Sequence, residues 1–283
     1  MKEYIINVTA QETRIAYLEE GRLAELSVER QESRSLVGNI YKGRVDSIVP
    51  GIQAAFIDIG FEKNGFLYVS DIAGTEGTGD FDFENGIVRF KTRGKRAKHQ
   101  SIESLLKKNQ HIMVQVAKDR LGTKGVRLTN FITLPGRYVV LMPTVKHLGV
   151  SRKIESEHER DRLKTILQEI RPKGMGLITR TAGEERKKTD FASDVKYLTK
   201  VWEDVKAKME SMKGPCLLHE DLGPILRLVR DSFTNDVDRL LVDDGTECDR
   251  VLKFLDTFAP NLKRKIKRYS GDEPIFDKHK IES

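Results

Sequence analysis

The chain has 283 residues, of which 33% are charged, and its 50 Lys and Arg outnumber its 43 Asp and Glu to give a formal net charge of +7. This length can bury a sizeable core in about two domains, and the basic balance favours polyanionic partners. No window approaches the roughly 18 apolar residues of a membrane span or the apolar region of a signal peptide, so we expect a cytoplasmic protein without a membrane span.

The first 35 residues predict three strands, at Tyr4–Thr9, Thr13–Glu19 and Leu23–Glu29. About thirty residues cannot form a core by themselves. We therefore expect this segment to pack against the C-terminal third of the chain, the only later segment of matching character.

Residues 38–72 predict a meander of strands. Three runs rich in apolar, β-branched and aromatic residues are separated by Gly, Pro or charged turns: Ile40–Val45, Ala54–Ile59 and Gly65–Val69. Alternation in the middle run places Ala55, Ile57 and Ile59 on one face, and Phe56 and Asp58 on the other. One face of this strand therefore carries an aromatic side chain outward.

Phe66 follows ten residues after Phe56 in a neighbouring strand. Two exposed Phe beside Lys42, Arg44 and Lys63 would form a stacking platform for single-stranded RNA. Alternatively, both Phe are core residues of a small barrel, which composition alone favours because Phe is usually buried.

The segment 73–100 is first rich in Gly and acids and then basic at Arg93–Lys98, and it predicts a long loop, functional or disordered. A Lys/Arg cluster without aromatics is more often a solvated tail than a binding site. Beyond it, Ser101–Lys108 predicts a short helix. The runs His111–Val116 and Gly125–Thr129 predict a hairpin that closes the barrel, with Lys124 presented at its turn.

A new unit begins at Phe131, and beyond residue 215 the predicted strands and helices alternate as in an α/β half-fold. The predicted elements are strands 137–142 and 175–180, helices 155–168 and 191–212, then strand 216–219, helix 222–233, strand 239–242, helix 247–258 and strand 263–269. Trp202 lies on the apolar side of its helix and is expected in the core. Gly214-Pro215 signals a boundary. Cys216 and Cys248 lack metal-ligand spacing and are expected to fill core space.

GLITRTAG, residues 176–183, is the strongest candidate site. A strand that ends in Arg-Thr-Ala-Gly places a guanidinium, a hydroxyl and backbone N–H groups at one loop, as a terminal phosphate requires. The motif is short, and an ordinary turn after a strand is the alternative that the residues alone favour.

Candidate catalytic carboxylates do not form a convincing two-metal constellation. Asp58 and Asp71 belong to the predicted barrel, and Asp190 and Asp194 are placed in the first turn of a helix, where acids favour the helix dipole. Asp243 and Asp244 end a strand and are the most suspect pair, although such pairs are more often structural than catalytic.

GNIYKGRV, PGIQAAFIDIG and GFLYVSDI resemble the S1-type OB domain of the ribonuclease E/G family, and residues 6–22 resemble the strand pair that precedes it there. The resemblance implies an α+β fold in which an RNase H-like α/β subdomain is split by two insertions. The implied divisions are RNase H-like segments 1–35 and 226–283, an S1-type OB β-barrel at 36–130 and a small α/β 5′-sensor subdomain at 131–225.

The resemblance also assigns RNA-contacting roles to Phe56, Phe66 and, at the edge of the S1 barrel, Lys124. It implies a 5′-monophosphate pocket at Arg180 and Thr181.

The implied supporting residues of this pocket are Gly136, Val140 and Arg152. Arg152 would supply a second cation, and Gly136 would allow close backbone approach.

In that family the catalytic aspartates, in a DNase I-like subdomain, and the zinc-linking cysteines lie beyond the segment that resembles residues 271–283. The implied parent activity is Mg²⁺-dependent hydrolysis of single-stranded, preferably 5′-monophosphorylated RNA in RNA processing and decay. For this chain alone we expect RNA binding without cleavage and no bound Mg²⁺ or Zn²⁺, whether it is a truncation or a natural short form. Homo-oligomers are implied for full-length proteins. The rival hypothesis is a non-enzymatic S1-domain protein in translation or transcription control.

Overall fold

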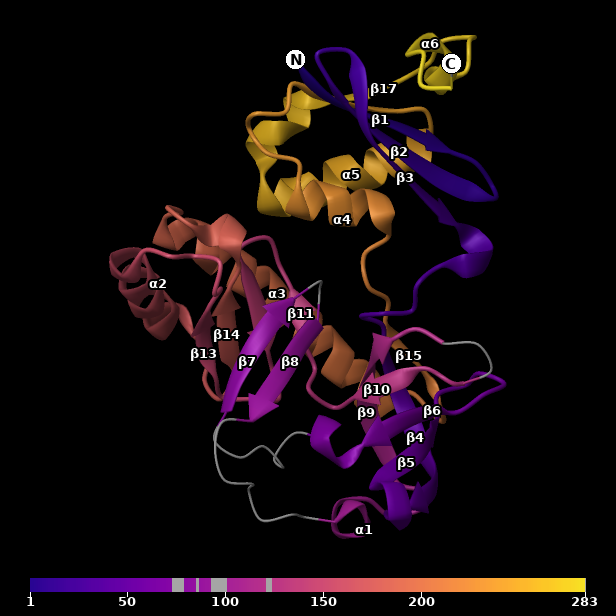
Figure 1. The fold of residues 1–283 in the computed structure, drawn as a ribbon, viewed down its shortest axis with the longest axis vertical. Coiled ribbons are helices and arrows are strands. Elements are labelled where there is room, and N and C mark those ends of the chain that lie inside the picture. Colours follow the sequence, from indigo (N-terminus) through magenta and orange to yellow (C-terminus); the bar gives the residue numbers. More distant parts are fainter. Residues whose placement is uncertain (73–78, 85–86, 93–100, 121–123, 283) are drawn as a thin grey trace. The chain divides into compact units, whose positions relative to one another are not determined.

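The computed structural model describes residues 1–72, 79–84, 87–92, 101–120 and 124–282, and the chain separates into two compact units (Figure 1). Unit 1 consists of Met1–Ser35 and Leu222–Ser283, and unit 2 consists of Leu36–Asp221. Both units combine helices and strands, which confirms the predicted α+β class. In the part of the chain that the structure describes, none of the helices is long and apolar enough to span a membrane.

Unit 1 is built on a five-stranded sheet in the order β17-β16-β1-β2-β3. Its strands are β1 (Lys2–Val8), β2 (Glu12–Glu19), β3 (Arg22–Arg30), β16 (Arg239–Val242) and β17 (Ile266–Arg268). β1 runs parallel to β16 and antiparallel to β2. The N-terminal strands therefore complete their core with the C-terminal third of the chain, as predicted.

Helices cover both faces of this sheet because the side chains of β1 alternate between them. Ile6 packs with α4 (Pro224–Asp231) and α5 (Gly245–Phe258), whereas Ile5 packs with α6 (Ile275–Lys278). The predicted strand 263–269 is wrong at its start, since Pro260–Lys265 forms a 3₁₀ helix and β17 begins only at Ile266. Proline fixes φ and lacks an N–H group, so it suits the first turn of a helix better than a ladder.

The first half of unit 2 contains a closed, OB-like β-barrel. Its strands are β4 (Ile40–Val49), β5 (Ala54–Asp58), β6 (Gly65–Tyr68), β9 (His111–Lys118) and β10 (Arg127–Thr129). They pair in the order β4-β5-β6-β10-β9, and β9 returns to β4 to close the barrel, as predicted. A short helix, α1 (Ile102–Leu105), lies within the predicted range 101–108 and contributes Ile102 to the barrel core.

Two predicted assignments in unit 2 are wrong. The segment predicted as a loop contains a hairpin of β7 (Gly79–Glu84) and β8 (Ile87–Thr92). The loop was predicted from the Gly- and acid-rich composition of this segment, and the alternation in DFDFE and VRFK was overlooked. Likewise, β15 (Cys216–His219) extends the barrel sheet beside β4 instead of opening the second α/β half.

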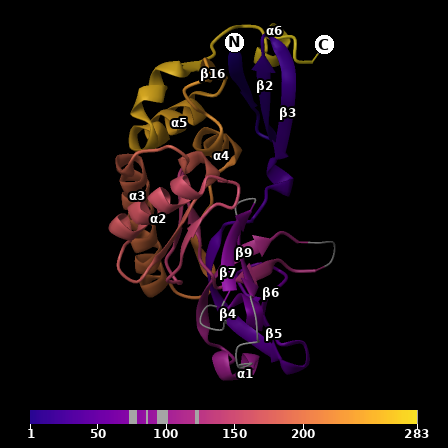
Figure 2. The same ribbon diagram turned by 60° about the vertical axis from the view of Figure 1, so that its left-hand side comes forward.

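The second half of unit 2 is a four-stranded sheet with two helices. Its elements are β11 (Leu134–Pro135), β12 (Val139–Met142), β13 (Leu148–Val150), β14 (Gly176–Thr179), α2 (Glu157–Ile170) and α3 (Lys188–Ser211). The two helices, α2 and α3, lie side by side (Figure 2). Both helices pack on the sheet and on each other, and Trp202 is buried among them, as predicted. Ser156 caps α2 by accepting from the backbone N–H of Glu159.

Candidate nucleic-acid interface

Phe56 and Phe66 lie opposite each other on the outside of the barrel. They are direct partners in the β5–β6 ladder, and both rings are half-buried. Their neighbours Ala55, Ile57 and Leu67 are sealed inside the barrel. Alternation therefore predicted the outward face of Phe56, and the RNA-binding role of both residues stays a prediction.

Tyr68 and Arg127 extend this aromatic surface, although the sequence reasoning missed both. The rings of Phe66 and Tyr68 meet edge to face with centroids 5.7 Å apart, and the Arg127 guanidinium lies 5.2 Å from the Tyr68 centroid. Arg127 also donates to the Asp71 carboxylate at 2.8 Å. Burial raises the pKa of Asp71, and Arg127 opposes that shift. Tyr68 stands two residues after Phe66 in the same strand, a spacing that could have identified it.

Two of the cations expected beside the platform have other partners. The Lys42 ammonium donates to the carbonyl oxygens of Met209 and Met212 at 2.7 and 2.8 Å, so it caps the end of α3. The Arg44 guanidinium pairs with Asp58 at 3.0 Å. The prediction that Lys42 presents its charge beside the aromatic platform is therefore wrong.

Lys124 is exposed at a turn that lies against the start of β6. A Cβ atom on the next residue, Gly125, would fall 2.0 Å from the carbonyl oxygen of Asn64, so only glycine fits there. Phe66 donates its backbone N–H to Val126 at 3.0 Å. Lys124 thus lies two residues before Val126, whose carbonyl oxygen accepts this bond from Phe66.

Arg180 and Thr181 follow β14 directly, and Arg152 follows the parallel strand β13. Because β13 and β14 pair in parallel, with Val150 opposite Thr179, their carboxyl ends emerge at the same sheet edge. Arg180 is half-buried, whereas Thr181 and Arg152 are exposed. Three of the five residues predicted for the phosphate pocket therefore gather at this edge.

Ser151 also belongs to this edge, and the sequence reasoning missed it. Its hydroxyl lies 3.0 Å from the hydroxyl of Thr181, and its backbone N–H donates to Thr179 at 2.9 Å. The Arg160 guanidinium donates to the Ser151 carbonyl oxygen at 2.7 Å and steadies the turn after β13. Ser151 lies beside Arg152 in the segment VSRKI, in which the sequence reasoning assigned a role only to Arg152.

The Arg180 side chain is oriented by the loop before β12. Its Nη1 atom donates to the Gly136 carbonyl oxygen at 2.6 Å, and its backbone N–H donates to Tyr138 at 2.8 Å. Gly136 is tightly enclosed, since a Cβ atom there would lie 2.5 Å from a carboxylate oxygen of Asp194. The close approach that Gly136 allows in this structure is to Asp194.

Val140 contributes packing. Its side chain is fully buried in a small apolar cluster with Phe131, Met142, Val145 and Ile178. Val140 also pairs with Ile178 across β12 and β14. It therefore supports the sheet at whose edge the phosphate pocket is predicted.

The sequence predicted Asp194 in the first turn of its helix, and this is wrong. Asp194 lies in the second turn of α3, where it is 1% exposed. Its carboxylate accepts three consecutive backbone N–H groups, from Arg137, Tyr138 and Val139. Burial raises the pKa of Asp194, while these hydrogen bonds and Arg180 oppose the shift. An acid three residues after Phe191 on the apolar stripe of this helix was the overlooked signal.

Asp243 and Asp244 are both occupied by structural hydrogen bonds. Asp243 accepts from the Asn7 amide at 2.6 Å and from the backbone N–H of Val8 at 2.9 Å. Asp244 caps α5 by accepting from Glu247. Among the described residues, no group of three or more His, Cys, Asp or Glu is placed to hold a metal ion. These two aspartates do not fit the Mg²⁺ site of a two-metal nuclease.

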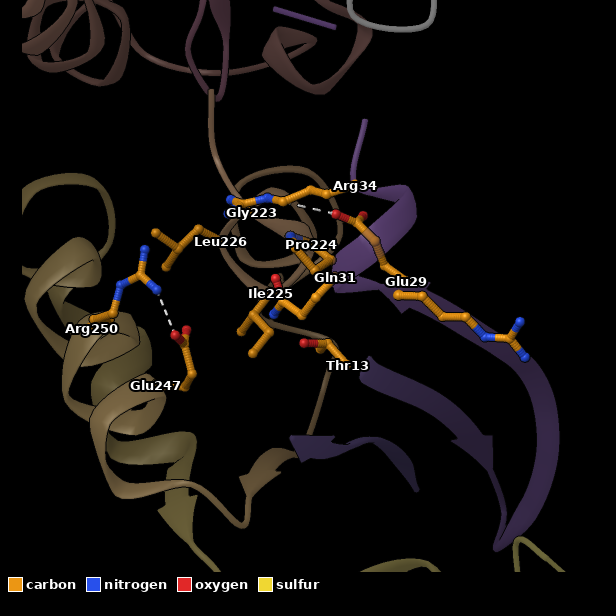
Figure 3. Close-up of a pocket in the computed structure, with 11 residues that line it drawn as sticks. Thr13, Glu29, Gln31, Arg34, Gly223, Pro224, Ile225, Leu226, Glu247 and Arg250 are labelled. Carbon is orange, nitrogen blue, oxygen red and sulfur yellow. Dashed lines mark hydrogen bonds and ion pairs between the residues drawn. The ribbon is translucent and has the colours of Figure 1, made fainter. Parts of the chain in front are cut away.

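A small polar pocket of about 60 Å³ lies in unit 1 (Figure 3). Its three arginines have acidic partners: Arg30 lies 3.5 Å from Glu12, Arg34 lies 4.0 Å from Glu29, and Arg250 pairs with Glu247. The volume suits about two water molecules. The pocket contains none of the predicted site residues.

Comparison with known proteins identifies the relatives of this chain. The profile of the Ribonuclease E/G family matches residues 133–283. Ribonuclease G of Escherichia coli (strain K12) is 42% identical over 99% of this chain and 55% of its own length, and ribonuclease G of Haemophilus influenzae is 40% identical with the same coverage. Ribonuclease E of Haemophilus influenzae is 34% identical over the whole chain and 29% of its own length. The chain thus spans about half of the ribonuclease G relatives, and it belongs to the ribonuclease E/G family.

Proposed function

We propose that this chain is the RNA-binding and 5′-monophosphate-sensing portion of a ribonuclease E/G-type endoribonuclease that acts on single-stranded RNA in RNA processing and decay. The observation that carries the proposal is the gathering of Arg180, Thr181 and Arg152 at one sheet edge. The similarity to ribonuclease G over nearly the whole chain supports it. It also favours a ribonuclease over the rival, a non-enzymatic S1-domain protein.

Two kinds of contact would hold the RNA. A 5′-monophosphate carries up to two negative charges, and a guanidinium with neighbouring hydroxyls matches its oxygens. Arg180 is held in place by Gly136, and Thr181 and Ser151 supply adjacent hydroxyls. Bases further along the strand would stack on Phe56 and Phe66, which is tolerant of sequence.

Binding of two otherwise identical oligonucleotides tests the proposal. We expect the chain to bind 5′-monophosphorylated single-stranded RNA more tightly than 5′-hydroxyl RNA, and Arg180→Ala to remove roughly tenfold or more of that preference, because a hydrogen bond to a charged group contributes about 1.5–3 kcal/mol. Arg171→Ala, an exposed cation at the end of α2, is the charge-matched control. Equal affinity of the wild-type chain for both oligonucleotides would refute the 5′-sensing role.

We further propose that this chain binds RNA without cleaving it, and that Mg²⁺-dependent hydrolysis belongs to the full-length enzyme. The structural partners of Asp243 and Asp244 support this division. Incubation with Mg²⁺ and a 5′-monophosphorylated A/U-rich RNA should leave the RNA intact. Turnover that disappears in Asp243→Asn would show the opposite.

A further inference from the structure

We infer that Asp194 is the positioning residue of the phosphate pocket: its buried carboxylate fixes the loop 136–139, and the carbonyl groups of that loop hold Arg180 in its binding orientation. This inference rests on the proposed 5′-sensing function. Asp194 itself lies in the protein interior and would not touch the RNA.

The N–H side of the loop faces Asp194. One carboxylate oxygen accepts from Arg137 at 3.1 Å, and the other accepts from Tyr138 at 2.7 Å and Val139 at 3.0 Å. The remaining amide, that of Gly136, donates to the Val139 carbonyl oxygen at 2.8 Å. Every amide of the loop is thereby satisfied, and three of the four are satisfied by one side chain, that of Asp194.

The C=O side of the same loop faces Arg180. Gly136 accepts from the guanidinium at 2.6 Å, and Tyr138 accepts from the Arg180 backbone N–H at 2.8 Å. Asp194 and Arg180 also attract each other electrostatically. The loop therefore links the buried Asp194 carboxylate to the Arg180 guanidinium, the cation that would contact the phosphate.

The charge of Asp194 matters separately from its size. Asparagine has the same shape but offers one acceptor oxygen, and its amide nitrogen would face an N–H donor of the loop. The side chain at position 194 fits closely against the loop, because a Cβ atom on Gly136 would lie 2.5 Å from a carboxylate oxygen of Asp194. Asp194→Asn should thus release the loop while preserving the volume of the core.

A merely structural role predicts a different result from a positioning role. If Asp194 only stabilises the fold, its loss lowers affinity for every RNA in proportion to the unfolded fraction. If Asp194 positions Arg180, its loss removes the preference for the 5′-phosphate and leaves 5′-hydroxyl RNA binding unchanged, because stacking on Phe56 and Phe66 does not involve this loop.

The test is a double-mutant cycle in the 283-residue chain, with both oligonucleotides. We expect Asp194→Asn to lose about tenfold of the 5′-phosphate preference and Arg180→Ala to lose a similar factor, with no further loss when the two are combined. Asp190→Asn is the matched control, since Asp190 lies on the same helix but caps its first turn.

The outcomes separate the two hypotheses. A wild-type chain without 5′-phosphate preference overturns the proposed function and the inference with it. A wild-type preference that Asp194→Asn keeps, or losses that simply multiply in the double variant, overturns the inference alone. If Trp202 fluorescence shows that Asp194→Asn is unfolded, hydrogen exchange of the wild-type amides 137–139 decides. We expect 5′-phosphate RNA to slow it more than 5′-hydroxyl RNA, and equal exchange overturns the inference.

Discussion

At the scale of single residues, the aromatic pair on the barrel is governed by strand alternation. Phe56 and Phe66 face each other across the β5–β6 ladder while their neighbours fill the interior. Their half-exposed rings are apolar surface that a base can cover. This geometry suits stacking of bases along an RNA strand and carries no information about the 5′ end of that RNA.

Replacing either ring therefore has a specific expected result. Phe56→Ala or Phe66→Ala should weaken binding of 5′-phosphate and 5′-hydroxyl RNA equally, by about 1–3 kcal/mol for each stacked base lost. Fluorescence anisotropy with both oligonucleotides measures this. Leu26→Ala, which truncates an exposed apolar residue of unit 1, is the control and should change neither affinity. Variants that lose affinity for only one RNA would contradict the stacking role.

Residue-level prediction from sequence succeeded where one strand determined the answer. Alternation placed Phe56 correctly because neighbouring side chains must point to opposite faces. Prediction from sequence failed for Lys42 and Asp194, whose partners lie far away in sequence. Lys42 caps α3, and Asp194 holds the loop 137–139. Such contacts are set by tertiary packing, which no local pattern encodes.

At the scale of elements, β15 joins the two halves of unit 2. It pairs with β4 of the barrel, and Leu218 is buried in the core of the second half. His219 is half-buried at the end of this strand. Burial lowers the pKa of His219, Lys208 adds to the shift, and Asp221 and Glu220 oppose it.

This lowered pKa predicts a pH dependence of stability in unit 2. Below pH 6.5, the ordinary pKa of histidine, the unfolded chain binds a proton that folded His219 resists, so stability falls as the pH falls, by up to about 1.4 kcal/mol per pH unit. Above that pH the full stability is present. Urea unfolding followed by Trp202 fluorescence should show a flatter pH profile for His219→Gln. His158→Gln, at an exposed position on α2, should keep the wild-type slope.

Element boundaries were predictable where periodicity was clear. The strand at Arg239–Val242 was predicted with its observed bounds, because a short apolar run there is flanked by charges. The β7–β8 hairpin was missed because the Gly- and acid-rich composition of its segment predicted a loop. The partner of β15 was also missed, since pairing between distant strands leaves no mark in either one.

At the scale of the whole molecule, the barrel and the second half of unit 2 share their interior. Ile40 of the barrel strand β4 packs in the same apolar cluster as Trp202. Buried Gln115 of β9 donates to the carbonyl oxygens of Gly38 and Thr133, and accepts from the backbone N–H of Thr133 at 2.9 Å. Breaking such a buried, satisfied network is costly. These contacts bind the predicted RNA-stacking surface and the predicted phosphate pocket into one folding unit.

A fragment of residues 36–221 should therefore fold by itself and retain RNA recognition, because it contains both cores and all eight predicted contact residues. We expect one unfolding transition, with Trp202 fluorescence and far-ultraviolet circular dichroism coinciding, and the 5′-phosphate preference of the 283-residue chain. A shorter fragment, 36–130, would lose β15 and the Gln115–Thr133 bonds and should be several kcal/mol less stable, since leaving buried polar groups unpaired costs about 1–3 kcal/mol each. Two separate transitions in the 36–221 fragment would show instead that the barrel and its neighbour fold independently.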